Sequence, residues 1–277
     1  RDSLSFSVLD FSNTNLILCS DSTYAEKEGF TDSESTLEEK LNQIISQSEG
    51  RILIATFSSL LSRIQQIITI SSLLGRKVSV VGRSMNRNLK VALDLGYVTD
   101  PQNTVIPLKD SKKLPDHKVL LITTGAQGES SSAMGLISRS EHSDVSIKNG
   151  DTIVISSSPI PGNEVKYSHM INNLFRQGGQ VIYQTISLVH VHGHGSREDL
   201  RRMIELVKPK YFIPIHGETR HLVAHAKIAE KSGVERENIF LIEDGDTVEF
   251  TDSKATLGNK VHSGTIYIDG SGTPKPR

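Results

Sequence analysis

Short runs of branched apolar residues alternate with segments of helical periodicity through the middle of this 277-residue chain. The apolar runs lie at residues 51–57, 77–82, 118–125, 151–158 and 180–186. Runs of this length, rich in Ile and Val and bounded by turn residues, are typical of strands buried on both faces. Strands that alternate with helices form βαβ units, so the pattern predicts an α/β fold with a parallel sheet covered by helices.

Helical spacing of apolar residues fills the gaps between the expected strands. The expected helices lie at residues 58–75, 85–96 and 162–179, and each segment ends at a glycine, which is a helix stop signal. Beyond residue 185 we expect a helix from Ser196, a strand that ends at His216, and a helix over residues 219–233. Ser196 followed by Asp199 resembles a capping box. Residues 3–11 predict a further strand, and residues 239–250 predict two strands around a tight turn.

Charge and cysteine content limit the classes of function. The net charge of −1 argues against a globally basic nucleic-acid binder, so such a function must use a local patch. Cys19 is the single cysteine, which excludes an internal disulfide and favours a reducing, cytoplasmic location. No apolar run approaches the roughly 20 residues of a membrane helix. The first residue is Arg1 and the C-terminal segment has linker composition, so we expect a piece of a longer protein.

Three histidines alternate along one segment: His190, His192 and His194, followed by Gly195 and Ser196. In an extended segment, alternate side chains share one face. Neutral imidazole ligates zinc and a donating imidazole binds phosphate, so both kinds of site are open. A helix that begins at Ser196 would add free N–H groups that favour an anion. The alternative without a function is a polar strand end.

Further polar residues follow predicted strands, at the edge where open α/β sheets bind ligands. His216 ends one such strand. Asp21 follows another apolar run, where a carboxylate can orient a metal-bound histidine or simply form a turn. Arg83 suits phosphate binding. The Gly- and Ser-rich loops at residues 123–129 and 156–164 are weaker candidates for the same role.

A series of segments, in the same order along the chain, resembles the ribonuclease J family of metallo-β-lactamase-fold nucleases with a β-CASP insertion. The segments are SDSTYAE, RILIATFSS, GRKVSVVGRSM, LLITTGAQGE, SPIPGNE, VHVHGHGSREDL and KPKYFIPIHGETRHLVAHAKIAE. The resemblance implies a parallel-sheet β-CASP domain at residues 22–185. It also implies the C-terminal part of a metallo-β-lactamase αββα domain, formed by residues 1–21 and 186–270, and a linker or tail at 271–277.

The resemblance implies a zinc-dependent ribonuclease that processes and degrades RNA by phosphodiester hydrolysis, as a 5′-to-3′ exonuclease and as an endonuclease. Two zinc ions activate a water in the complete family enzyme. By the same resemblance Asp21 and His194 fall on catalytic motifs, and His216 falls on a zinc ligand. The implied partners are RNA, single-stranded by preference, and further copies of the full-length protein, with no membrane partner.

The family's phosphate-holding loop matches this chain at His190 and Ser196. His192 stands where that loop usually has a serine, and Gly195 where it usually has an alanine, which alters the expected pocket. We also expect Arg83 and Ser84 to grip RNA phosphates, and His192 to lie within the same substrate-binding group.

The chain departs from the family in lacking the HxHxDH motif that supplies the first zinc ligands. No histidine precedes Asp21, and none of the ten histidines forms that motif. The matching ligand His216 alone is too few for a catalytic zinc, which takes three protein ligands. We therefore expect a fragment without the HxHxDH half and the C-terminal domain, one that does not bind both zinc ions and is inactive by itself.

Two alternatives to a ribonuclease fragment remain open at this point. The first is a non-catalytic RNA-binding or scaffolding β-CASP protein, which the missing ligands favour and the retained Asp21, His194 and His216 oppose. The second is a related β-CASP nuclease that acts on DNA, to which the His-rich segment and the segment around His216 are less similar.

Overall fold

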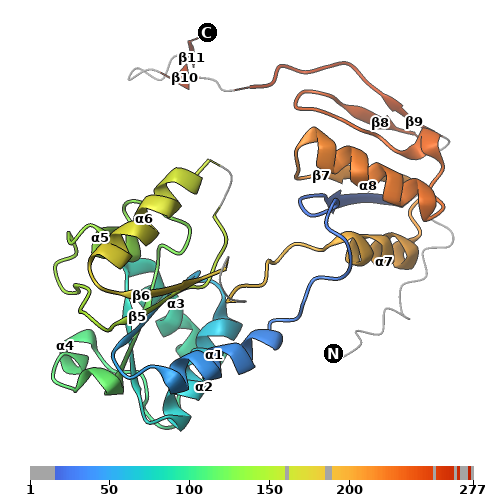
Figure 1. The fold of residues 1–277 in the computed structure, drawn as a ribbon. Coiled ribbons are helices and arrows are strands. Elements are labelled where there is room, and N and C mark those ends of the chain that lie inside the picture. The colour runs from blue at the N-terminus through green and yellow to red at the C-terminus, as the bar shows by residue number, and fades with distance from the viewer. Residues whose placement is uncertain are drawn as a thin grey trace. The chain divides into compact units, whose positions relative to one another are not determined.

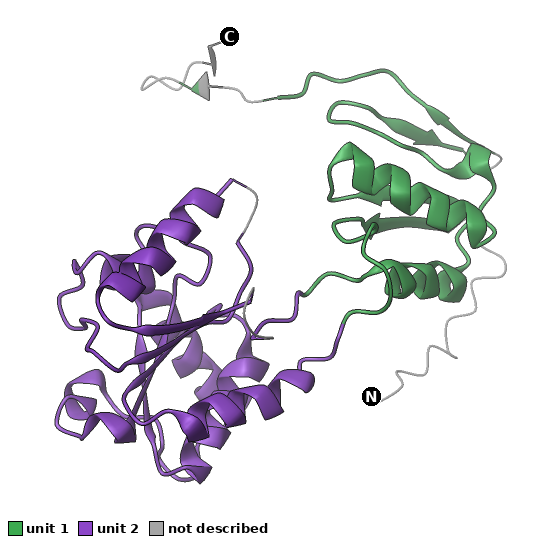
Figure 2. Cartoon of the chain, viewed as in Figure 1, with its two compact units in different colours: residues 1–31, 193–277 green, residues 32–192 purple. Residues whose placement is uncertain are grey.

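The chain forms two compact units in the computed structural model, which describes residues 16–159, 162–184, 189–251, 254–264, 267–268 and 274–275. Unit 2 comprises residues 32–192, and unit 1 comprises residues 1–31 together with 193–277 (Figure 2). Unit 2 is therefore inserted between two parts of unit 1. The domain division expected from the sequence, after residues 21 and 185, stays a prediction, and the expected strand at residues 3–11 lies outside the described residues.

Unit 2 is built on a five-stranded parallel sheet in the order β3-β4-β2-β5-β6 (Figure 1). Its strands are Ile52–Ala55 (β2), Lys77–Val81 (β3), Val119–Thr123 (β4), Thr152–Ile155 (β5) and Gln180–Tyr183 (β6). The central strand β2 pairs with two neighbours, because Ile52 is in register with Leu120 of β4 and with Thr152 of β5. The predicted parallel sheet is confirmed.

Helices cover both faces of this sheet (Figure 1). They are Thr36–Gln47 (α1), Leu61–Leu73 (α2), Arg83–Asp94 (α3), Leu108–Ser111 (α4), Ala133–Ser138 (α5) and Glu164–Arg176 (α6), with a 3-10 turn at Asp116–Lys118. Alternate side chains of β2 point to opposite faces. Ile52 and Ile54 pack in one core with α1, α2 and α3, whereas Leu53 and Ala55 pack in a second core with α5 and α6.

The course of α2 shows why these segments fold as they do. Its buried residues Ile64, Ile67, Ile68 and Ser71 recur at the spacing of one helical face. The helix ends before Gly75, whose φ of +67° lies in the left-handed region that only glycine adopts without strain. The chain then turns directly into β3.

Unit 1 contains a parallel pair of strands, Ile17–Asp21 (β1) and Tyr211–Ile215 (β7). The helices Arg197–Val207 (α7) and Thr219–Lys231 (α8) pack on one side, where Phe212 lies among their apolar residues. Tyr211 and Ile213 point to the other side and contact Phe240. The remaining elements are a 3-10 turn at Arg236–Asn238, the pair Val248–Phe250 (β8) and Ala255–Leu257 (β9), and the pair Tyr267–Ile268 (β10) and Pro274–Lys275 (β11). Among the described residues, no helix combines the length and the apolar character needed to span a membrane.

One strand prediction in unit 1 is wrong. The sequence predicts two strands around the turn at Asp244 and Gly245, but residues 240–243 form no strand. This segment interacts with β7 instead: Ile239 forms an isolated parallel bridge with Phe212, and the Phe240 N–H donates to the Phe212 carbonyl at 2.9 Å. Burial of the Phe240 side chain against Tyr211 therefore sets its path, and β8 pairs with β9.

A buried ion pair joins the starts of β2 and β5. Arg51 Nη2 lies 2.6 Å from Asp151 Oδ2, and the Asp151 side chain is only 2 % exposed. The same carboxylate accepts the Lys148 backbone N–H at 2.8 Å. Removing one partner of a buried pair leaves an uncompensated charge, which costs far more than the loss of a surface pair.

We expect Asp151→Ala to lower the free energy of unfolding by about 3 kcal/mol, because the Arg51 guanidinium loses its partner in a buried position. Urea denaturation followed by circular dichroism measures the change. Asp116→Ala is the matched control: Asp116 pairs with Lys148 at 2.5 Å, but both side chains are exposed, so less than about 1 kcal/mol is expected. Equal losses in the two variants would contradict the assigned role of the buried pair.

Candidate metal and acid–base site

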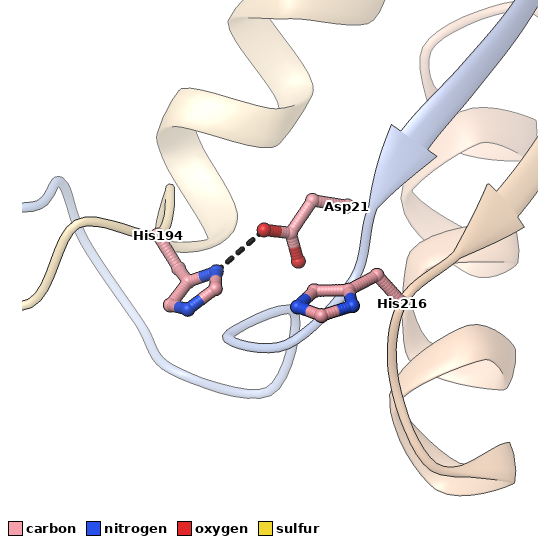
Figure 3. A group of neighbouring side chains, drawn as sticks. All are labelled: Asp21, His194 and His216. Carbon is pink, nitrogen blue, oxygen red and sulfur yellow. Dashed lines mark hydrogen bonds and ion pairs between the residues drawn. The ribbon is translucent and has the colours of Figure 1, made fainter.

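Three side chains that can ligate a metal meet at the carboxyl ends of β1 and β7 (Figure 3). Asp21 is the last residue of β1 and His216 directly follows β7, and the two strands are parallel, so both side chains emerge at the same edge. His194 lies just before α7. One potential ligand atom from each residue lies within 4.8 Å of the others. The structure thus brings together the two predicted catalytic residues and the predicted metal ligand.

Asp21 and His194 are directly bonded within this group. Asp21 Oδ2 lies 2.5 Å from His194 Nδ1, and Asp21 Oδ1 accepts the Thr23 N–H at 2.8 Å. Burial by itself would raise the pKa of Asp21, but the bonds from Thr23 and His194 outweigh it, so the pKa lies below its ordinary value of 3.8. The His194 and His216 rings are stacked, with centroids 5.6 Å apart. The group is therefore a carboxylate anion beside two imidazoles.

The backbone at His216 has an unusual conformation. Its φ of +54° lies in the left-handed region, which is uncommon for a residue with a side chain. Thr23 Oγ1 donates to the His216 carbonyl at 2.9 Å, and the Ser22 N–H donates to the Ile215 carbonyl at 2.9 Å. Such strain costs about 1 kcal/mol or more and persists where the surroundings enforce it, as is common at functional sites.

The start of α7 carries the predicted capping box. The Ser196 N–H donates to Asp199 Oδ2 at 3.1 Å, and the Thr31 N–H donates to the same oxygen at 2.8 Å. Ser196 is fully buried, and its hydroxyl lies 3.0 Å from Thr31 Oγ1, which also donates to the His194 carbonyl at 2.9 Å. The capping box is confirmed and stabilises the turn that holds His194. Phosphate binding by Ser196 stays a prediction.

The three alternate histidines are divided between the two units. Residues 189–192 form no strand and residues 193 and 194 form a bend, so the strand end expected here is wrong. His190 and His192 belong to unit 2 and are almost fully buried, whereas His194 belongs to unit 1. His190 Nδ1 lies 3.3 Å from Arg63 Nη1. Burial, together with the charges of Arg63 and His192, lowers the pKa of His190 from 6.5 to about 4.

The predicted phosphate-binding residues Arg83 and Ser84 lie at the start of α3 in unit 2. Both are exposed. Arg83 lines a cavity of about 890 Å³ along β3 and α3, together with Asn86, Lys90 and His142. Arg83 has no ion-pair partner among the described residues, so its guanidinium is available to an anion.

Comparison with known proteins gives matches along most of the chain. Residues 49–174 match the family described as "Ribonuclease J, beta-CASP domain", and residues 178–241 match the "Zn-dependent metallo-hydrolase RNA specificity domain". Ribonuclease J2 of Bacillus subtilis is 44% identical over 257 residues, which are 93% of this chain and 46% of the relative. Ribonuclease J of Synechocystis is 42% identical over 257 residues, 93% of this chain and 40% of the relative. Ribonuclease J of Helicobacter pylori strain B128 is 40% identical over 254 residues, 92% and 37% respectively. The chain thus spans less than half the length of these relatives.

The sequence analysis assigned no role to His225, which lies directly behind the site. His225 is fully buried on α8, and its Nδ1 lies 3.0 Å from the hydroxyl of Ser22, the residue that follows Asp21. Its ring meets Phe212 edge to face at 4.9 Å. Burial lowers the pKa of His225 from 6.5 to about 4, while the nearby Asp21 opposes the shift. The available signal was its position three and four residues before Ile228 and Ala229, on the apolar face of the helix.

We expect His225→Asn to flatten the pH dependence of folding stability. The unfolded chain binds a proton at His225 near pH 6.5 and the folded chain only near pH 4, so its contribution is complete above 6.5 and is lost as the pH falls. For one such group, the free energy of unfolding changes by at most about 1.4 kcal/mol per pH unit. Asparagine can keep the bond to Ser22 without titrating. Urea unfolding at several pH values measures both slopes, and parallel curves would contradict the neutral state of His225.

Proposed function

This chain belongs to the ribonuclease J family, and from that premise we propose that it is part of a zinc-dependent ribonuclease that hydrolyses single-stranded RNA. The observation that carries the proposal is the convergence of Asp21, His194 and His216 at one sheet edge. The similarity to an RNA specificity domain and to relatives named ribonuclease supports RNA, rather than DNA, as the substrate. Exonuclease and endonuclease activity, a cytoplasmic location and a homo-oligomer belong to the same proposal.

The donor set fits zinc. Zinc prefers imidazole nitrogen and carboxylate oxygen, and a catalytic zinc commonly has three protein ligands and one open position. His216 would hold the metal, with Asp21 and His194 beside it. When bound, zinc supplies an activated water for phosphodiester hydrolysis. Among the described residues, Asp21, His194 and His216 are the one group of side chains that could hold a metal ion. Two zinc ions in the complete enzyme would therefore need further ligands.

Asp21 and His194 form a pair suited to proton transfer. The low pKa of Asp21 keeps it an anion, which accepts the Nδ1–H of His194 and orients the ring. Proton exchange with the substrate would then use Nε2, as in a carboxylate–histidine pair that protonates a leaving oxygen. The His216 ring lies stacked beside that of His194, with centroids 5.6 Å apart.

Five residues are proposed to bind RNA phosphates: Arg83, Ser84, His190, His192 and Ser196. Arg83 is best supported, because it is exposed and can bind a phosphate through two N–H groups. His190 is neutral, so it would donate a single hydrogen bond rather than act as a cation. Ser196 is proposed on the resemblance alone, because its side chain is fully buried and the N–H groups of Ser196, Arg197 and Glu198 already donate to other residues.

We expect the chain to bind zinc at this site, and His216→Ala to weaken zinc binding by about 10-fold or more, because the imidazole that would hold the metal is lost. Competition with a zinc-sensitive dye measures the dissociation constants. His117→Ala is the matched control, since His117 is an exposed histidine of unit 2, and it should leave the affinity unchanged. Equal affinities for wild type and His216→Ala would overturn the assigned metal site.

In the complete protein, we expect His194→Asn to lower kcat by about 100-fold or more, since an amide can donate to Asp21 but cannot exchange a proton. Asp21→Asn should cause most of the same loss, because it no longer favours the required tautomer of His194. The readout is release of nucleotides from 5′-monophosphorylated single-stranded RNA at saturating zinc. Unchanged kcat in His194→Asn would overturn the catalytic role of His194, whereas RNA binding without any turnover by the complete wild-type protein would support the non-catalytic RNA-binding alternative.

A further inference from the structure

Arg63 is a fully buried cation on α2 whose guanidinium has two different sets of partners. On one side it binds Glu34: Nη2 lies 2.7 Å from both carboxylate oxygens, and Nε lies 3.2 Å from Oε2. On the other side Nη1 lies 2.7 Å from Ser156 Oγ and 3.3 Å from His190 Nδ1. The Arg63 side chain is 0% exposed. A buried charge is tolerated only with such complete pairing.

The contact with Arg63 determines which nitrogen of His190 carries the proton. A guanidinium has five N–H donors, no acceptor, and stays protonated at every accessible pH. His190 Nδ1 must therefore accept the hydrogen bond through its lone pair. A neutral imidazole has one N–H group, so the proton of His190 lies on Nε2.

A second chain of hydrogen bonds holds the backbone beside the same ring. Ser156 Oγ lies 2.6 Å from the Val189 carbonyl, which can only accept, so the Ser156 hydroxyl donates to Val189. The Ser156 oxygen then accepts from Arg63 Nη1. Arg63 thus acts on the ring of His190 directly and on the preceding residue through one hydroxyl, while Glu34 fixes Arg63 itself.

The other ring nitrogen of His190 remains available to a ligand. Among the described residues no hydrogen bond engages Nε2, and His190 keeps 8% of its surface exposed. We propose that Arg63 is a positioning residue that holds His190 as a neutral Nε2–H donor for a phosphate oxygen of RNA. This role rests on the proposed function, because that function supplies the phosphate ligand.

The position of the proton is measurable without RNA. Long-range ¹H–¹⁵N correlation spectra distinguish a protonated from an unprotonated ring nitrogen, and His190→Gln identifies the signals of His190. We expect the proton on Nε2 in wild type and in Arg63→Lys, which retains a cation that only donates. Arg63→Met should give a mixture of both tautomers. Glu34→Gln and Ser156→Ala, which leave Arg63 beside the ring, should keep the proton on Nε2. A proton on Nδ1 in wild type overturns the proposal even if Arg63→Met does not fold.

RNA binding tests the second half of the proposal. Fluorescence anisotropy with a labelled single-stranded oligoribonucleotide, in EDTA, measures affinity without cleavage. We expect Arg63→Met and His190→Gln each to weaken binding by about 10-fold, the value of one hydrogen bond to a charged group. The double variant should lose no more than either single variant, because both remove the same contact. Arg63→Lys should restore most of the affinity.

The outcomes separate this proposal from the proposed function. Additive losses in the double variant would show that Arg63 acts independently of His190, and normal binding by Arg63→Met would show that it does not act on RNA. Failure of the wild-type chain to bind the oligoribonucleotide would overturn the RNA role of His190 together with the proposed function. The tautomer spectra would still decide whether Arg63 controls the proton of His190.

Discussion

The parallel pairing of β1 with β7 is the constraint on which the site depends. Parallel strands end at the same edge of a sheet, so Asp21 and His216 are brought together although 194 positions separate them in the chain. Register decides this as well, because Asp21 is paired with Ile215, the last residue of β7, and His216 directly follows that residue. A slip of one residue would turn the Asp21 side chain to the opposite face and remove it from the group.

Polar groups next to β1 and β7 form hydrogen bonds that hold the residues of the site in place. His225 contacts Ser22, which follows Asp21, and Thr31 links the Ser196 cap to the His194 carbonyl. Each of these groups loses its hydrogen bonds to water on folding and gains a defined hydrogen bond within the protein. Leaving any one of them unpaired would lower the free energy of unfolding by about 1–3 kcal/mol. Unit 2 uses the same device around Arg63, where a buried cation is satisfied by a carboxylate, a hydroxyl and an imidazole. In both units, hydrogen bonding that ends in a histidine sets the position or the protonation of its ring.

The sequence predicted features that depend on residues close together in the chain, and it failed for features that depend on residues far apart. The βαβ pattern of unit 2 and the capping box at Ser196 arise from residues close in sequence, and both were predicted correctly. The strand expected before Asp244 and the strand end expected at the three alternate histidines did not form. In the first case Phe240 packs against Tyr211, and in the second Arg63 and Asp21 bind different rings. The spacing of residue types along a short segment contains no information about which distant residues will contact that segment.

The sequence by itself predicted the strand and helix order of unit 2 and the family, and it singled out Asp21, His194 and His216 as candidate site residues, because residue type and local periodicity carry this information. Only the tertiary structure decided that these three side chains converge, that Ser196 is buried in a cap, and that His190 is a neutral ring against Arg63. The physical reason is that protonation and ligand geometry depend on burial and on distances of a few ångströms. Those are set by contacts between residues that lie far apart in the chain.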